Sequence, residues 1–202
     1  LFRTITIDGK DVGGNERVQV GICPQHNVLF PALTVSEHLN FYATLKNGNQ
    51  SKKEMAAASA EMIADLRLEG KRDAMASTLS GGMQRRLCIG IAFIGGSKIV
   101  ILDEPTAGVD PFARRAIWDL ILKYKENHTV ILTTHFMDEA EILGDHVAIL
   151  SEVMRLLLLY LSIKYYFVIS IKGSLKAFGT PMTLKEQHGN GYRLSVSFNS
   201  NW

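Results

Sequence analysis

Two short segments of this sequence carry residues that could do chemistry on a phosphate-bearing substrate. In the first, Ser80 is followed by Gly81 and Gly82, which puts a hydroxyl and two peptides without side chains at the start of an expected helix. The first backbone N–H groups of a helix have no internal partner and lie at its positive end, so anions bind there. Taken alone, the segment is more typical of an ordinary helix start capped by Ser80.

The second segment changes that interpretation. An apolar run at residues 99–102 ends in Asp103 and Glu104. Such runs are typical of parallel strands covered on both faces, and ligands bind at the carboxyl ends of these strands. Asp103 is suited to hold Mg²⁺, which takes one or two carboxylates together with phosphate and water. Glu104 is suited to polarise an attacking water. The alternative, an exposed acidic turn, is disfavoured by the large apolar residues directly before it.

Two more polar residues follow expected strands. His135, after a strand at 129–133, could donate a hydrogen bond to a terminal phosphate or to the attacking water. Gln25, after a short strand at 18–22, is a weaker candidate. The other histidines lack ligand spacing, and we expect them at the surface or in hairpins: they are His26, His38, His128, His146 and His188. A loop of the form G-x-x-x-x-G-K-[ST], which wraps phosphates, is absent from the sequence.

The elements that must position these residues predict an α/β fold. Strands are expected at 18–22, 99–102, 129–133 and 146–150, separated by helices at 82–93, 110–124 and 137–143. Strands that alternate with helices form a mainly parallel sheet with helices on both faces. Asp110 and Pro111 begin one helix as its N-cap and first residue. Antiparallel strands are expected at the edges, in a hairpin at 4–10 and in an alternating strand at 192–196.

Residues 34–78 predict a helical subdomain within this chain. Thr34 with Glu37, and Ser51 with Glu54, each form a capping box that satisfies free N–H groups at a helix start. Helical spacing places the apolar residues of each helix on one face: Val35, Leu39, Tyr42 and Leu45 in the first, and Met55, Met62, Ile63 and Leu66 in the second.

Length and composition narrow the class of protein. The 202 residues are enough for one or two domains with a core, and 47% of them are hydrophobic. The formal net charge of +2 gives no general reason to expect a polyanionic partner. Cys23 and Cys88 are far apart and neither belongs to a CxxC, which argues against a disulfide framework or a zinc site.

Together these motifs resemble the nucleotide-binding domain of ABC transporters. Residues 79–84 match the LSGGQ signature, with Met83 as an inserted departure before Gln84. The other matches are residues 99–104 to Walker B and the catalytic glutamate, 107–110 to the D-loop, Gln25 to the Q-loop and His135 to the H-loop. Within the family, the amino-acid sequence is most similar to subfamily A, the lipid exporters, in segments 23–30, 79–86, 106–111 and 134–140.

The resemblance implies a P-loop NTPase-like fold and a Mg²⁺-dependent ATPase, with ATP and Mg²⁺ as cofactors. It assigns catalysis to Glu104 and His135, Mg²⁺ binding to Asp103, and nucleotide and metal coupling to Gln25 and Asp110. It also implies that ATP held mainly by a second, head-to-tail nucleotide-binding domain contacts the signature residues Ser80, Gly81, Gly82 and Gln84.

The resemblance further implies that transmembrane domains are partners and that the chain lies at the cytoplasmic face of a membrane. It implies coupling of ATP hydrolysis to lipid export, and no nucleic acid is expected as a partner. The family's Walker A loop lies N-terminal to the hairpin at 4–10. We therefore expect one partial cassette domain, residues 1–202, truncated after that loop and with little or no ATPase activity alone. A soluble ABC ATPase of translation or DNA repair, and a non-catalytic fragment or gene-model product, are the alternatives.

Residues 153–172 form an atypical apolar insertion without a counterpart in the family pattern. Without it, residues 148–152 would meet 173–179 in a tight hairpin. It could be a translated intron or gene-model error, a genuine loop or added strand pair, or a membrane-spanning segment. We favour the first because the flanks rejoin so cleanly. Spanning is disfavoured because it needs about 20 apolar residues and a central Lys costs about 2.5–3.5 kcal/mol.

Overall fold

The computed structural model of the chain describes residues 6–7, 10–11, 19–46, 51–151, 156–159 and 174–188. The strands are β1 (Thr6–Ile7), β2 (Lys10–Asp11), β3 (Val20–Cys23), β4 (Ile99–Asp103), β5 (Thr129–Thr134), β6 (His146–Ser151), β7 (Leu156–Leu159) and β8 (Ser174–Gly179). The helices are α1 (Val35–Lys46), α2 (Lys52–Asp65), α3 (Gly81–Phe93), α4 (Pro111–Lys125), α5 (Met137–Leu143) and α6 (Pro181–His188), with 3₁₀ turns at Glu69–Lys71 and Ala76–Thr78.

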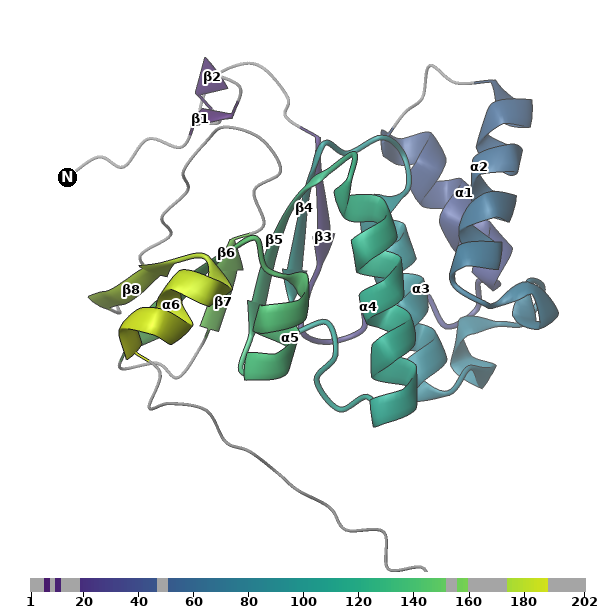
Figure 1. Cartoon of the computed structure of the whole chain (residues 1–202). Coiled ribbons are helices and arrows are strands. Elements are labelled where there is room, and N and C mark those ends of the chain that lie inside the picture. The colour runs from purple at the N-terminus through teal and green to yellow at the C-terminus, as the bar shows by residue number, and fades with distance from the viewer. Residues whose placement is uncertain are drawn as a thin grey trace, which may run out of the picture.

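A six-stranded sheet in the order β3-β4-β5-β7-β6-β8 forms the centre of the molecule (Figure 1). β3, β4 and β5 are parallel, with Cys23 opposite Leu102 and Leu102 opposite Leu132. This confirms the parallel α/β architecture that the sequence predicts. β1 and β2 form a separate antiparallel hairpin, as expected for residues 4–10. The strand expected at 192–196 lies outside the described residues.

The other half of the sheet is antiparallel. β6 pairs with β8, so the two segments that were expected to form a hairpin only without the insertion are paired with the insertion present. β7, which comes from the insertion itself, lies between β5 and β6 and is antiparallel to both, so an antiparallel strand occurs inside the sheet as well as at its edge. The rest of 153–172 lies outside the described residues. Among the helices that the structure describes, none combines the length and apolar character needed to cross a membrane.

The helices cover the sheet on one face. That face carries the fully buried residues Val100, Leu102, Val130 and Leu132, against which α3 lies closely. Gly21 allows this approach, because a Cβ there would lie 1.9 Å from the carbonyl oxygen of Ala92. On the opposite face Ile22, Ile101 and Ile131 lie side by side in the paired strands, and Ile22 is 58% exposed whereas Ile131 is 7% exposed.

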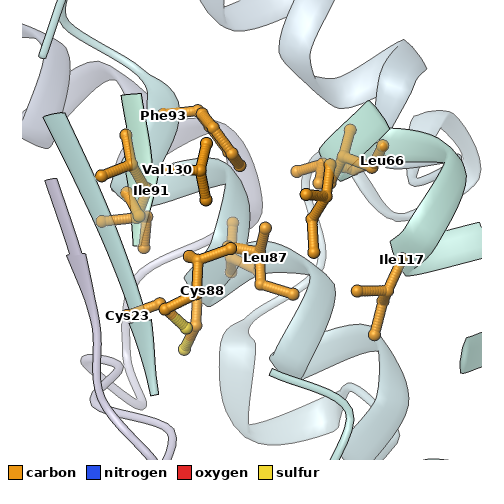
Figure 2. Close-up of a cluster of buried hydrophobic side chains, with 14 of the residues drawn as sticks. Cys23, Leu66, Leu87, Cys88, Ile91, Phe93, Ile117 and Val130 are labelled. Carbon is orange, nitrogen blue, oxygen red and sulfur yellow. The ribbon is translucent and has the colours of Figure 1, made fainter. Parts of the chain in front are cut away.

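The core lies between the sheet and the helices behind α3. Figure 2 shows Leu87 and Cys88 of α3 between Cys23 and Val130 on the sheet side and Leu66 and Ile117 on the helix side. All of these side chains are at most 4% exposed. α3 is therefore held on two sides, and the segment at its N-terminus is fixed relative to the strand ends.

Within residues 34–78, the helices and their caps match those expected from the sequence, with two corrections. Both capping boxes are present: the Glu37 N–H donates to Thr34 Oγ1 over 3.2 Å, and Ser51 and Glu54 make the same reciprocal bonds. Leu45, expected on the buried face of α1, is 68% exposed. It lies in the last turn of α1, at the edge of the buried stripe, which is completed by His38 and Ala43. His38, expected at the surface, is fully buried.

Candidate functional site

Three parallel strands end at one edge of the sheet, and each delivers one of the residues predicted for the site. β3 ends at Cys23, two residues before Gln25. β4 ends at Asp103, directly before Glu104, and β5 ends directly before His135. Because the strands are parallel and in register, their carboxyl ends lie side by side. This edge is where open parallel sheets bind ligands.

One carboxylate oxygen is the meeting point of these side chains. The amide nitrogen of Gln25 donates to Oε2 of Glu104 over 3.2 Å. Nδ1 of His135 lies 3.6 Å from the same oxygen. The Glu104 side chain is 11% exposed and that of His135 is 44% exposed, so the carboxylate is nearly enclosed while the imidazole faces outward. An amide, an imidazole and a carboxylate thus face one small volume that solvent can reach.

The backbone of Glu104 is held in an unusual conformation. Its φ of 47° lies in the left-handed region that side chains other than glycine rarely adopt. Its N–H donates to the carbonyl oxygen of Thr133 over 3.0 Å and to Oγ1 of Thr133 over 3.1 Å. Strain of this kind costs of order 1–3 kcal/mol and persists where the surrounding contacts impose it, which is common at functional sites. Glu104 and Asp103 make side-chain hydrogen bonds to different residues, Glu104 with Gln25 and Asp103 with Thr133.

Asp103 has the surroundings expected of a ligand for a hard cation. Its Oδ1 accepts a hydrogen bond from the Thr133 hydroxyl, which orients the carboxylate at the end of β4. The described residues hold no group of three or more His, Cys, Asp and Glu side chains able to bind a metal ion. One oriented carboxylate fits Mg²⁺, which binds through one or two carboxylates while phosphate and water supply its other ligands. A single carboxylate does not fit an ion whose ligands must all come from the protein.

The start of α3 carries the serine and glycines of the signature. Ser80 is the N-cap, and its Oγ accepts from the Met83 N–H over 3.4 Å. Ser80 and Gly81 are exposed, and nothing lies within 4 Å of where a Cβ on Gly81 would be. The tip is therefore open to a ligand from outside the chain. α3 runs without a break through Met83.

Gln84 and Asp110 are engaged within the chain. The Gln84 amide donates to the carbonyl oxygens of Ala76 and Leu79, at 3.0 and 3.4 Å, so it holds the turn that precedes the tip. Oδ1 of Asp110 caps α4 by accepting from the N–H groups of Phe112 and Ala113. The hydrogen bonds of Gln84 are thus local to the turn before α3, and those of Asp110 are local to the start of α4.

Arg85 is a residue of the site that motif reasoning missed. It is 3% exposed and lies one turn into α3. Its five N–H groups donate to five oxygens: the carbonyls of Pro24, Asp103, Glu104 and Pro105, and Oδ1 of Asn27. A planar guanidinium with five fixed donors suits such a junction. An arginine within the apolar pattern of α3 was the available sequence signal.

Glu139 is a second residue that was missed. It is fully buried in α5, and its Oε1 accepts from Thr106 Oγ1 over 2.9 Å and from Trp118 Nε1 over 3.0 Å. Thr106 belongs to the loop after Glu104, and α5 follows His135. The bond therefore joins the two segments that leave the site. The acidic start of α5 gave no indication that this carboxylate is internal.

Comparison with known proteins shows the family of this chain. Residues 3–107 match the ABC transporter family. ATP-binding cassette sub-family A member 2 of Rattus norvegicus is 51% identical over 180 residues, which are 89% of this chain and 6% of that protein. The retinal-specific phospholipid-transporting ATPase ABCA4 of Mus musculus is 46% identical over 196 residues, which are 96% of this chain and 8% of that protein. The chain thus spans less than a tenth of these curated relatives.

Solved structures show the same fold. The dimeric structure of the bacterial ABC transporter cassette MJ0796 has a TM-score of 0.57 and 27% identity, over 64% of this chain and 57% of that one. A post-hydrolysis dimer of the same cassette bound to ADP and Pi has a TM-score of 0.61 and 26% identity, over 69% and 65% of the two chains. The family match and the relatives show that this chain belongs to the ABC transporter family, and the relatives named here are members of its subfamily A.

Proposed function

We propose that this chain is a nucleotide-binding domain of a subfamily A transporter, which couples ATP binding and hydrolysis to the export of lipid across a membrane. One observation carries the proposal: Gln25 and His135 converge on Glu104 Oε2 at the carboxyl ends of three parallel strands. Two of the curated relatives, ABCA4 and ABCA3, are described as phospholipid-transporting ATPases, which supports lipid as the transported substrate.

The residues of the strand ends take distinct roles in hydrolysis. Glu104 accepts a hydrogen bond from the attacking water and polarises it, and Gln25 holds the carboxylate in place from the other side. His135, more exposed, donates to the terminal phosphate as charge develops there. Asp103 would hold Mg²⁺, which when bound neutralises charge on the phosphates. Asp110 fixes the end of the loop that follows Glu104 by capping α4.

The α3 tip acts on a different nucleotide. Ser80 and Gly81 are exposed at a helix N-terminus, where N–H groups favour phosphate. These residues, together with Gly82 and the turn held by Gln84, would contact ATP held mainly by a second nucleotide-binding domain in a head-to-tail pair. The dimeric state of the MJ0796 cassettes supports such a partner. Transmembrane domains are the other partners, which places this chain at the cytoplasmic face of the membrane.

The first test is the activity of the chain alone. The sequence has no G-x-x-x-x-G-K-[ST] loop to cradle the β- and γ-phosphates, so we expect little or no ATP turnover by the purified 202 residues. Release of phosphate from Mg²⁺·ATP measures this. Robust Mg²⁺-dependent turnover that disappears in Glu104→Gln would contradict the expectation and would show that the site is complete within the chain.

The second test separates an active half-site from a non-catalytic fragment, the alternative that the missing loop favours. The chain is mixed with the complete cassette domains of the Rattus norvegicus relative, and ATP hydrolysis is measured. We expect the chain to change the rate, and Ser80→Arg to abolish the effect by blocking the α3 tip. Ser77→Arg, on the exposed turn before the tip, is the matched control and should retain it. If wild type and Ser80→Arg are equally without effect, the chain is a non-catalytic fragment.

A further inference from the structure

Arg85 lies between the α3 tip and the residues at the strand ends. It is five residues beyond Ser80 on α3, so a single helix carries both the exposed tip and the buried guanidinium. Nη2 of Arg85 donates to the carbonyl oxygens of Asp103 and Glu104 at 2.8 and 2.9 Å. Nη1 donates to the carbonyl oxygen of Pro24, directly before Gln25, at 2.5 Å.

These contacts leave the guanidinium little freedom. Arg85 is 3% exposed, and a buried charge is stable only while its donors remain paired. The guanidinium is planar, so its donors keep fixed relative directions. A displacement of α3 must therefore either move the carbonyl groups next to Gln25 and Glu104 or leave a buried cation unsatisfied. The helix itself transmits the displacement, because it is continuous from Gly81 to Phe93 and is enclosed on two sides by the core.

We propose that Arg85 is a positioning residue that links the α3 tip to Gln25 and Glu104, so that nucleotide held at the tip alters this chain's own hydrolytic residues. The inference rests on the proposed function, since it takes the tip to bind a triphosphate. It goes further by connecting the site that faces a partner domain with the site at the strand ends. The connection consists of one continuous helix and the hydrogen bonds of Arg85, and such rigid elements and hydrogen-bond networks can carry coupling between two distinct sites.

The neighbouring arginine provides a matched control. Arg86 is on the same helix, but its Nη1 donates to the carbonyl oxygens of Leu66 and Arg67 at 2.5 and 3.3 Å. These oxygens belong to the end of α2 and the turn after it, away from the strand ends. Arg86→Lys and Arg85→Lys thus make the same chemical change on one helix, with contacts to the site altered only in the second variant.

The experiment is a nuclear magnetic resonance titration of the isotope-labelled full chain with Mg²⁺·ATP, in the presence of the unlabelled complete cassette domains of the Rattus norvegicus relative. The backbone amides of Gly81 and Gly82 report on the tip, and the side-chain amide of Gln25 reports on the strand ends. In wild type and in Arg86→Lys, we expect both sets of resonances to shift with one saturation curve. In Arg85→Lys, we expect the glycine shifts to remain and most of the Gln25 shift to be lost.

A second measurement needs no variant. The Nε–H resonance of Arg85 must shift with the same saturation curve as Gly81 and Gln25, whereas that of Arg86 must not. A Gln25 shift that persists in Arg85→Lys, or that occurs in wild type without a shift of Arg85 Nε–H, overturns the inference, because nucleotide then reaches Gln25 by another route. Glycines that shift without Gln25 overturn it too. If the glycines do not respond at all, binding at the tip fails, and the proposed function of the tip fails with it.

Discussion

The side-chain amide of Gln25 donates to Oε2 of Glu104 over 3.2 Å, although the two residues are 79 positions apart in the sequence. The bond requires both the parallel pairing of β3 with β4 and the left-handed backbone of Glu104, whose φ is 47°. The carboxylate is thus aimed by a turn that is itself strained. Function and stability are expected to oppose each other at this residue.

Glycine at position 104 should therefore stabilise the chain. We expect Glu104→Gly to have a free energy of unfolding about 1 kcal/mol higher than Glu104→Gln, because both lose the ionised carboxylate but only glycine adopts positive φ without strain. Urea unfolding followed by circular dichroism measures the difference. Arg67, with φ of 54°, is the control away from the site, and Arg67→Gly should gain a similar amount over Arg67→Gln. Equal stability of the two Glu104 variants would show that the turn is not strained.

Glu139 should be sensitive to the loss of its acceptor and much less to the loss of its charge. Glu139→Ala leaves Thr106 Oγ1 and Trp118 Nε1 as buried donors without their acceptor, and we expect a destabilisation of about 2–4 kcal/mol. Glu139→Gln keeps an oxygen for both donors and should cost about 1 kcal/mol or less. Trp118 fluorescence during urea unfolding, in a Trp202→Phe background, measures both. Similar losses in the two variants would indicate that the charge, not the acceptor, stabilises this contact.

Lys46 closes the C-terminal end of α3. Its Nζ donates to the carbonyl oxygens of Ile91, Ala92 and Ile94 at 2.7, 2.9 and 3.1 Å, where a helix leaves carbonyls without partners. We expect Lys46→Met to lower the free energy of unfolding by about 1.5–3 kcal/mol. Lys52→Met, at an exposed position of α2, should change it by less than about 0.5 kcal/mol. Chemical denaturation tests the pair, and equal effects would mean that these three bonds add nothing to stability.

The two cysteines should be inert in the folded chain. Cys23 is fully buried and Cys88 is 4% exposed. Burial raises the pKa of the Cys23 thiol to about 12 and also raises the pKa of Cys88. Because only the thiolate reacts, we expect no labelling by a disulfide reagent at pH 8 under native conditions and complete labelling in urea. Rapid native labelling of either residue would show that the core around α3 opens readily.

Much of the local structure could be predicted from the sequence, because it depends on neighbours in the chain. The capping boxes at Thr34 and Ser51, and the N-cap at Asp110, use groups three or fewer residues apart. The apolar runs of β4 and β5 and the polar residues that end them also follow from composition and spacing. Because β3, β4 and β5 are parallel, Gln25, Glu104 and His135 lie at one edge of the sheet. Their proximity could therefore be expected from the sequence.

Contacts that depend on packing between distant segments could not be predicted in this way. The burial of His38 and the exposure of Leu45 depend on which stripe of α1 faces its neighbours. β7 takes its place between β5 and β6 through backbone pairing, which an all-leucine segment does not specify. The burial of these side chains and the position of β7 depend on contacts that form only when the sheet and the helices assemble.

The amino-acid sequence alone determined which residues can bind phosphate, hold a cation and polarise water, since those properties belong to the side chains and their immediate neighbours. Only the tertiary structure decided how they are held. The acceptors of Arg85 and the donors to Glu139 come from other segments of the chain and surround these side chains only after folding. Burying a polar group costs free energy unless hydrogen bonds compensate for its lost hydration. The partners that make those bonds come together only when the chain folds.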